Sequence, residues 1–155
     1  MGSQFDGQGV LRNWWTDADR KAFDALGARL VTQFDAYEAL PGKHVNGKLT
    51  LGENTADNGG ARIALMALEN MIKASGKTPE NIDGYTPEQR YFLGFARVWC
   101  EKRTPEYSRT LVTIDPHSPG RFRTNGVVEN MPEFQKAWGC KTGQAMVSPN
   151  MCRVW

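Results

Sequence analysis

A chain of 155 residues is long enough to enclose one hydrophobic core, and a hydrophobic content of 40% excludes intrinsic disorder. The net charge of +2, with basic residues scattered along the sequence, argues against a nucleic-acid partner. No apolar run approaches the length of a membrane span, and the N-terminus lacks the basic start and apolar core of a signal peptide. We therefore expect one folded domain over residues 1–155.

Hydrophobic periodicity and capping signals predict a mainly helical chain. Thr16 is typical of a helix N-cap, and apolar residues at helical spacing predict a helix as far as about Glu38. A second helix is predicted from about residue 51 to 74, with Gly76 as its C-terminal stop. Because apolar residues cover most of its circumference, this second helix should be buried on several sides.

The second half of the chain predicts shorter helices. Thr86 followed by a proline opens a helix to about Lys102, and Thr104 followed by a proline opens another to about Thr113. Residues 115–120 contain two prolines and a glycine and should be irregular. We expect two short helices broken at a proline within residues 121–139, and a loop from residue 143 onward.

The strongest chemical signal is a pair of carboxylates, Glu53 and Asp57, in a run of small and amide-bearing residues. On a helix, this spacing places both side chains on one face, one turn apart. Such a pair suits a metal ligand and a second carboxylate that supports its neighbours. The alternative explanation is a solvated first helical turn, where the helix dipole favours acidic residues.

Two further candidate side chains lie in and just beyond the proline-containing loop, His117 and Arg123. A loop histidine or a lone arginine is most often a capping or surface residue. With a metal ion, however, an imidazole can stabilise an oxyanion and a guanidinium can hold a substrate carbonyl, as amide hydrolysis requires. The sequence contains no His-Glu-x-x-His, no Gly-x-Ser-x-Gly elbow, no phosphate loop and no dinucleotide fingerprint.

Residues 52–60, GENTADNGG, closely resemble the GENxADxGG segment of the neprilysin-like zinc metallopeptidases, the M13 family. The resemblance implies a mainly α fold, the helical C-terminal lobe of a thermolysin-like (gluzincin) catalytic domain. It extends over the whole chain through further segments that follow in the same order: NWWT at 13–16, HVNG at 44–47, FARVWC at 95–100, DPHSPGRFR at 115–123 and CRVW at 152–155.

The resemblance also implies a role for each candidate site residue. Glu53 matches the third zinc ligand, and Asp57 matches the carboxylate that orients a zinc-bound histidine. His117 matches the histidine that stabilises the tetrahedral intermediate, and Arg123 matches the arginine that contacts the substrate backbone. The implied activity is hydrolysis of peptide bonds beside hydrophobic residues by a zinc-activated water.

Substrate binding and the remaining zinc ligands are implied in the same way. Val98 and Trp99 match residues that line the pocket for a hydrophobic side chain on the leaving side of the scissile bond. The family's His-Glu-x-x-His helix supplies two zinc ligands and the general base, and it would lie just upstream of residues 2–5. We therefore expect zinc and peptide substrates for the intact peptidase, and no catalytic activity in this chain without its missing N-terminal part.

Two other interpretations stay open. The chain is either a standalone, non-catalytic module that binds peptides or proteins without zinc, or part of an enzyme reconstituted when another chain supplies the zinc-binding helix. In addition, apolar surface left uncovered by a missing part predicts either a homodimer or a modestly stable monomer.

The three cysteines cannot all pair within one chain. The resemblance implies that the partners of Cys100 and Cys140 belong to the missing N-terminal part, and that the partner of Cys152 would fall near Arg29. We therefore expect mostly free thiols. Because family members are typically extracellular or periplasmic, the resemblance implies export of the intact protein.

Overall fold

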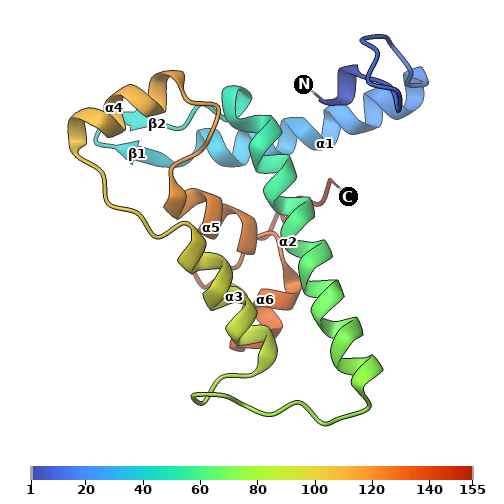
Figure 1. The fold of residues 1–155 in the computed structure, drawn as a ribbon. Helices are drawn as coiled ribbons and strands as arrows, with labels where there is room; N and C mark the ends of the chain where they lie inside the picture. The colour runs from blue at the N-terminus through green and yellow to red at the C-terminus, as the bar shows by residue number, and fades with distance from the viewer. Residues whose placement is uncertain (1, 155) are drawn as a thin grey trace.

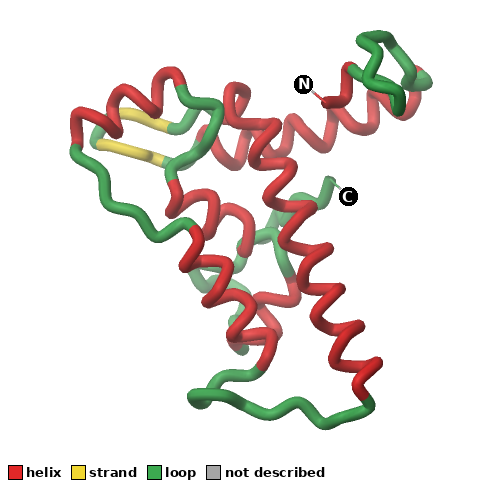
Figure 2. Tube along the Cα trace, viewed as in Figure 1, coloured by secondary structure: helices red, strands yellow, loops and turns green. Residues whose placement is uncertain are grey.

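The computed structural model describes residues 2–154, which form a mainly helical unit (Figure 1). The helical fold predicted from the sequence is confirmed, and strands are confined to one short hairpin (Figure 2). None of the described helices is long and apolar enough to cross a membrane. The elements in chain order are a 3-10 turn at Gly2–Gln4, α1 at Asp17–Asp35, β1 at Glu38–Leu40, β2 at Lys43–His44, α2 at Gly47–Ser75, α3 at Pro87–Val98, α4 at Pro105–Ile114, α5 at Gly120–Val128 and α6 at Pro132–Trp138.

Side-chain caps set the starts of three helices where the sequence predicts them. Thr16 begins α1 by accepting a hydrogen bond from the backbone N–H of Asp19. Thr86 and Gln89 form a reciprocal capping box at the start of α3, and Thr104 caps α4. Each cap satisfies an N–H group that has no partner within the helix, so these boundaries follow from local sequence.

Helix α2 begins at Gly47, earlier than the predicted start near residue 51, because Asn46 acts as its N-cap. It ends at Gly76 in the left-handed conformation, as predicted. Glu53 therefore lies well past the first turn, and the helix dipole does not explain its presence there.

The prediction that α2 is buried on several sides is wrong. Leu65 on its inner face is 2% exposed, whereas Ile63 and Met71 on its outer face are 66% and 65% exposed. The inner face packs against α1, α3 and α5. Periodicity identified the apolar residues of α2, but only the packing shows that one apolar face has no neighbour among the described residues.

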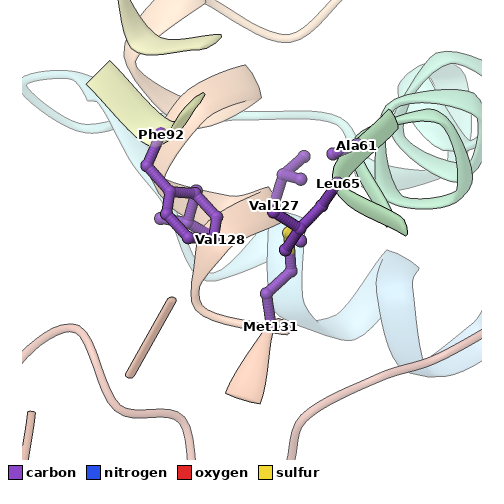
Figure 3. Packing of buried hydrophobic residues seen from close by; sticks show 6 residues of the cluster. All are labelled: Ala61, Leu65, Phe92, Val127, Val128 and Met131. Carbon is purple, nitrogen blue, oxygen red and sulfur yellow. The ribbon is translucent and has the colours of Figure 1, made fainter. Parts of the chain in front are cut away.

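The core consists of two clusters of buried side chains that meet at α5. The first lies where α2, α3 and α5 converge above α6 (Figure 3), and it comprises Ala61, Leu65, Phe92, Val127, Val128 and Met131. The second joins α1, α5, the hairpin and the C-terminal tail, and it comprises Leu30, Phe34, Val45, Phe122 and Cys152. Since each fully buried side chain of this size contributes about 1.5–3 kcal/mol, α5 is held firmly from both sides.

Close approach and polar contacts fix α5 against α1. A Cβ atom at Gly126 would lie 2.8 Å from the ring of Phe34, so only glycine fits there. The side-chain amide of Gln33 donates to the carbonyl oxygen of Gly126 at 2.9 Å. The hydroxyl of Tyr37 donates to Glu129 at 2.9 Å, and burial raises the pKa of both groups.

The C-terminal tail is clamped onto α1 by Arg29. Its guanidinium donates to the carbonyl oxygen of Met151 at 2.9 Å, and the neighbouring Cys152 is 2% exposed. The backbone N–H of Cys152 donates to the side chain of Asn130 at 2.8 Å. The position near which the resemblance places a cysteine partner thus carries a side chain that holds the same tail by hydrogen bonds.

Replacing Arg29 by alanine should loosen this tail. Loss of the clamp should cost about 1 kcal/mol locally, so thiol reagents should label Cys152 about fivefold faster. Burial raises the pKa of the Cys152 thiol, which keeps its labelling slow in the parent chain. Mass spectrometry can follow the labelling, with exposed Cys100 as the internal reference and Arg20→Ala on the same helix as the control. An unchanged labelling rate in Arg29→Ala would contradict the clamp.

Candidate functional site

Four side chains predicted from the sequence as site residues meet beside α2. Glu53 and Asp57 extend from α2, Arg123 from α5, and His117 from the loop that precedes α5. The Nε2 atom of His117 and the Nη2 atom of Arg123 lie 3.2 Å and 3.3 Å from the same carboxylate oxygen of Glu53, Oε2. Residues more than 60 positions apart in the sequence thus converge on one carboxylate.

Arg123 and Asp57 form a bidentate ion pair in this site. Arg123 donates from Nε to Oδ2 of Asp57 at 2.6 Å and from Nη2 to Oδ1 at 2.7 Å. The two side chains are 10% and 11% exposed. Fork-to-fork pairing of guanidinium and carboxylate is strong and strongly directional. It locks both side chains in one orientation.

The ring of Trp99 packs against the guanidinium group of Arg123. The guanidinium carbon of Arg123 lies 3.8 Å from the centre of the Trp99 ring, which is a cation–π arrangement. Burial by itself would lower the pKa of Arg123, but its bonds to Asp57 and the charges of Asp57 and Glu53 outweigh burial and raise it.

Asp115 orients the imidazole of His117. Its Oδ1 atom accepts a hydrogen bond from the backbone N–H of His117 at 2.9 Å and lies 2.6 Å from the ring Nδ1 atom. Burial would raise the pKa of Asp115, but the hydrogen bonds and charge of His117 outweigh it, so that the pKa is lowered. The carboxylate therefore fixes the orientation of the ring, with Nε2 facing Glu53.

Asp115 was not predicted as a site residue, although the sequence contains a signal for it. Aspartate commonly accepts a hydrogen bond from the backbone two residues further on, and Asp115 stands two residues before His117. Glu101 was overlooked as well. It accepts a hydrogen bond from the backbone N–H of Gly120 at 2.9 Å and so ties the end of this loop to the segment after α3. No local sequence signal predicts that second contact.

Val98 and Trp99 are neighbours in sequence but line different clefts. Val98 is 70% exposed and borders an open cleft of about 520 Å³ between α2 and α3, with Asp57 among its lining residues. Trp99 borders another cleft, of about 430 Å³, together with Arg103 and Arg121. In this chain the two side chains therefore do not form one pocket.

The described residues do not by themselves form a metal site. Among residues 2–154, no group of three or more histidine, cysteine, aspartate or glutamate side chains is arranged to hold a metal ion. Glu53 has only His117 close by as a further ligand type, and both oxygens of Asp57 are taken by Arg123. A zinc ion needs at least three protein ligands, so this chain offers an incomplete donor set.

Gly120 should be irreplaceable in the loop that carries His117. A Cβ atom there would lie 2.4 Å from the carbonyl oxygen of Trp99, so Gly120→Ala must displace the loop or the segment after α3. We expect a loss of about 1–3 kcal/mol of unfolding free energy, measurable by thermal or urea denaturation. Gly94→Ala in α3, where a Cβ meets nothing within 4 Å, is the matched control and should be neutral or stabilising. Equal stability of the two variants would show that the loop adapts.

Comparison with known proteins gives the family to which this chain belongs. Residues 1–154 match the model for peptidase family M13. The chain is 43% identical over 156 residues to endothelin-converting enzyme 1 from Homo sapiens, and the match covers the whole chain but 20% of that enzyme. It is 39% identical over 158 residues to human neprilysin, covering 99% of the chain and 21% of neprilysin.

The solved structures agree with this match. The zinc metalloprotease Zmp1 of Mycobacterium tuberculosis, in complex with an inhibitor, superposes with a TM-score of 0.91 at 39% identity, over 99% of this chain and 24% of that protein. PepO from Lactobacillus rhamnosis superposes with a TM-score of 0.79 at 35% identity. This chain therefore belongs to peptidase family M13 and spans about a fifth of the length of the relatives it matches.

Proposed function

We propose that this chain is the C-terminal part of the catalytic domain of a zinc metalloendopeptidase that cleaves peptide bonds beside hydrophobic residues. The observation that carries the proposal is the convergence of His117 and Arg123 on one oxygen of Glu53, beside the Arg123–Asp57 pair. Membership of family M13 supports a peptidase function. Because the chain spans about a fifth of its relatives, the activity is proposed for the longer protein.

The proposed division of labour begins with the two carboxylates of α2. Glu53 is the zinc ligand that this chain contributes, and two histidines outside the chain would complete the donor set. Asp57 would orient one of those histidines, as a supporting carboxylate does around a metal. Its bonds to Arg123 hold it in a single orientation for that task.

His117 and Arg123 are proposed to act on the substrate. With Nδ1 held by Asp115, Nε2 of His117 faces Glu53, and an N–H group at this position can donate to a developing oxyanion. Arg123 uses Nε and Nη2 on the carboxylates, and its Nη1 has no hydrogen-bond partner among residues 2–154. That group can donate to a substrate carbonyl. Val98 and Trp99 border different clefts in this chain, so their shared contact with the hydrophobic side chain on the leaving side is proposed for the longer peptidase only.

The exposed apolar face of α2 is proposed to contact the N-terminal part of the same peptidase. Ile63, Met66 and Met71 are more than half exposed along this face. The relatives give no support to a homodimer, which was one of the two states predicted from the sequence. Export of the intact protein to an extracellular or periplasmic location remains part of the proposal. The alternative of a standalone, non-catalytic binding module rests on the incomplete metal donor set and on the open cleft between α2 and α3.

This chain alone should not hydrolyse peptides at any zinc concentration. Glu53 supplies one ligand, and catalysis also needs further ligands and a base to take the proton of the water. Zinc titration with a quenched hydrophobic peptide tests this expectation. Zinc-dependent cleavage that disappears in Glu53→Ala would show that the chain completes a catalytic site by itself.

In the longer peptidase, His117→Ala and Arg123→Ala should have different kinetic effects. Loss of an oxyanion donor should lower kcat by about 100- to 1,000-fold with KM nearly unchanged, because the contact forms in the transition state. Arg123→Ala should chiefly raise KM, since a substrate carbonyl is present before the reaction.

The control for these variants is Arg109→Ala, which removes an exposed arginine from α4. It should leave both constants near their parent values. Arg123→Ala also leaves Asp57 unpaired and will lower the melting temperature, so kinetics are compared well below it. If His117→Ala and Arg123→Ala raise KM and lower kcat alike, the two residues merely brace the loop.

A further inference from the structure

A row of buried polar side chains runs along the inner face of α2, next to the two carboxylates. Thr50, Asn54 and Asn58 recur every fourth residue and are 3%, 1% and 6% exposed. The helical period places them on one face, each buried asparagine directly following a site carboxylate, Glu53 or Asp57. Because burying an amide is unfavourable without hydrogen bonds, each must be paired with a definite partner.

The partner of Asn54 is the residue that follows His117. The hydroxyl of Ser118 donates to Oδ1 of Asn54 at 2.9 Å, and Ser118 is 2% exposed. The amide of Asn54 in turn donates to the hydroxyl of Thr50 at 2.9 Å. One buried hydrogen bond between side chains therefore connects the residue that follows His117 to the residue that follows Glu53.

Apart from the contact between the imidazole itself and Glu53, the other side-chain contacts of the loop among the described residues do not lead to α2. Asp115 belongs to the same loop, so it orients the imidazole ring but moves together with it. The bond between Gly120 and Glu101 ties the loop to the segment after α3, and not to α2. Pro116 and the proline at 119 restrict the backbone on both sides of His117, so a displacement at Ser118 is passed on to the imidazole.

We propose that Ser118 is a positioning residue, which through its buried bond to Asn54 holds the imidazole of His117 at its place beside Glu53. This inference rests on the proposed oxyanion role of His117. Ser118 itself contacts no substrate. Its effect on the reaction comes from the placement of His117, and displacement of a catalytic group by about 1 Å can cost about 100-fold in rate.

The test is a double-mutant cycle in the longer peptidase. Ser118→Ala should lower kcat by about 10- to 100-fold with KM within about twofold, because the misplaced group acts in the transition state. In a His117→Ala background, the same substitution should change kcat by less than about twofold, since there is no imidazole left to position. A residue that only stabilises the fold would lower kcat by the same factor in both backgrounds.

Two further variants keep the result interpretable. Leu65→Ala removes a buried side chain of the first core cluster, away from the loop, and should lower the melting temperature without a selective loss of kcat. Ser118→Cys keeps a side chain of similar shape with a weak donor, so its kcat should lie between those of the parent and Ser118→Ala. It carries the test if Ser118→Ala does not fold.

The possible outcomes distinguish failure of the oxyanion role of His117 from failure of the positioning role of Ser118. If His117→Ala itself leaves kcat unchanged, the proposed oxyanion role fails, and the positioning role fails with it. If His117→Ala lowers kcat but the two substitutions act independently, only the positioning role of Ser118 is overturned. A parent-like kcat in both Ser118 variants has the same meaning.

Discussion

The contact on which the site depends is the ion pair between Arg123 of α5 and Asp57 of α2. Its two hydrogen bonds, at 2.6 Å and 2.7 Å, join the helix that carries Glu53 to the helix that follows the loop of His117. Charges buried to this degree are tolerated only when their hydrogen bonds are satisfied, and removing one partner is strongly destabilising. The Trp99 ring lies against the guanidinium, and the two core clusters hold α5 from either side.

Helix α2 separates its tasks by face. Glu53 and Asp57 lie along one edge of the helix and contact His117 and Arg123. The inner face behind this edge carries the buried Asn54 and Asn58. Asn54 accepts from Ser118, while Asn58 accepts from Asn130, whose own oxygen holds the backbone of the tail. The inner face thus ties the loop and the tail to the same rigid helix. Side chains on such an element are held more accurately than side chains on a loop alone.

The outer face of α2 has the opposite character. It is apolar and exposed, and the cleft between α2 and α3 that opens beside it is lined by small residues such as Gly60 and Ala64. Helix α2 carries Glu53, around which the described residues supply too few metal ligands. The same helix carries an apolar face that no described element covers. Both features fit a chain that spans about a fifth of its relatives. A contiguous apolar surface of this kind is characteristic of an interface.

The sequence by itself determined the features that depend on neighbours within one helical turn. The starts of α1, α3 and α4 follow from Thr16, Thr86 and Thr104, since a cap acts three residues away. The spacing of Glu53 and Asp57 likewise set them on one face of a helix. The motifs and their order also identified the family correctly, through their resemblance to known members of that family.

Only the tertiary structure decided the contacts between distant segments. Asp57 and Arg123 are 66 residues apart, and Asn54 and Ser118 are 64 apart, so no local pattern predicts either pair. The prediction that α2 is buried on several sides was wrong for the same reason. Apolar periodicity shows which residues can be buried, but it does not show which neighbouring element is present. Val98 and Trp99 face different clefts because α3 ends between them and the backbone turns. Long-range packing, and not propensity, fixed the geometry of the site.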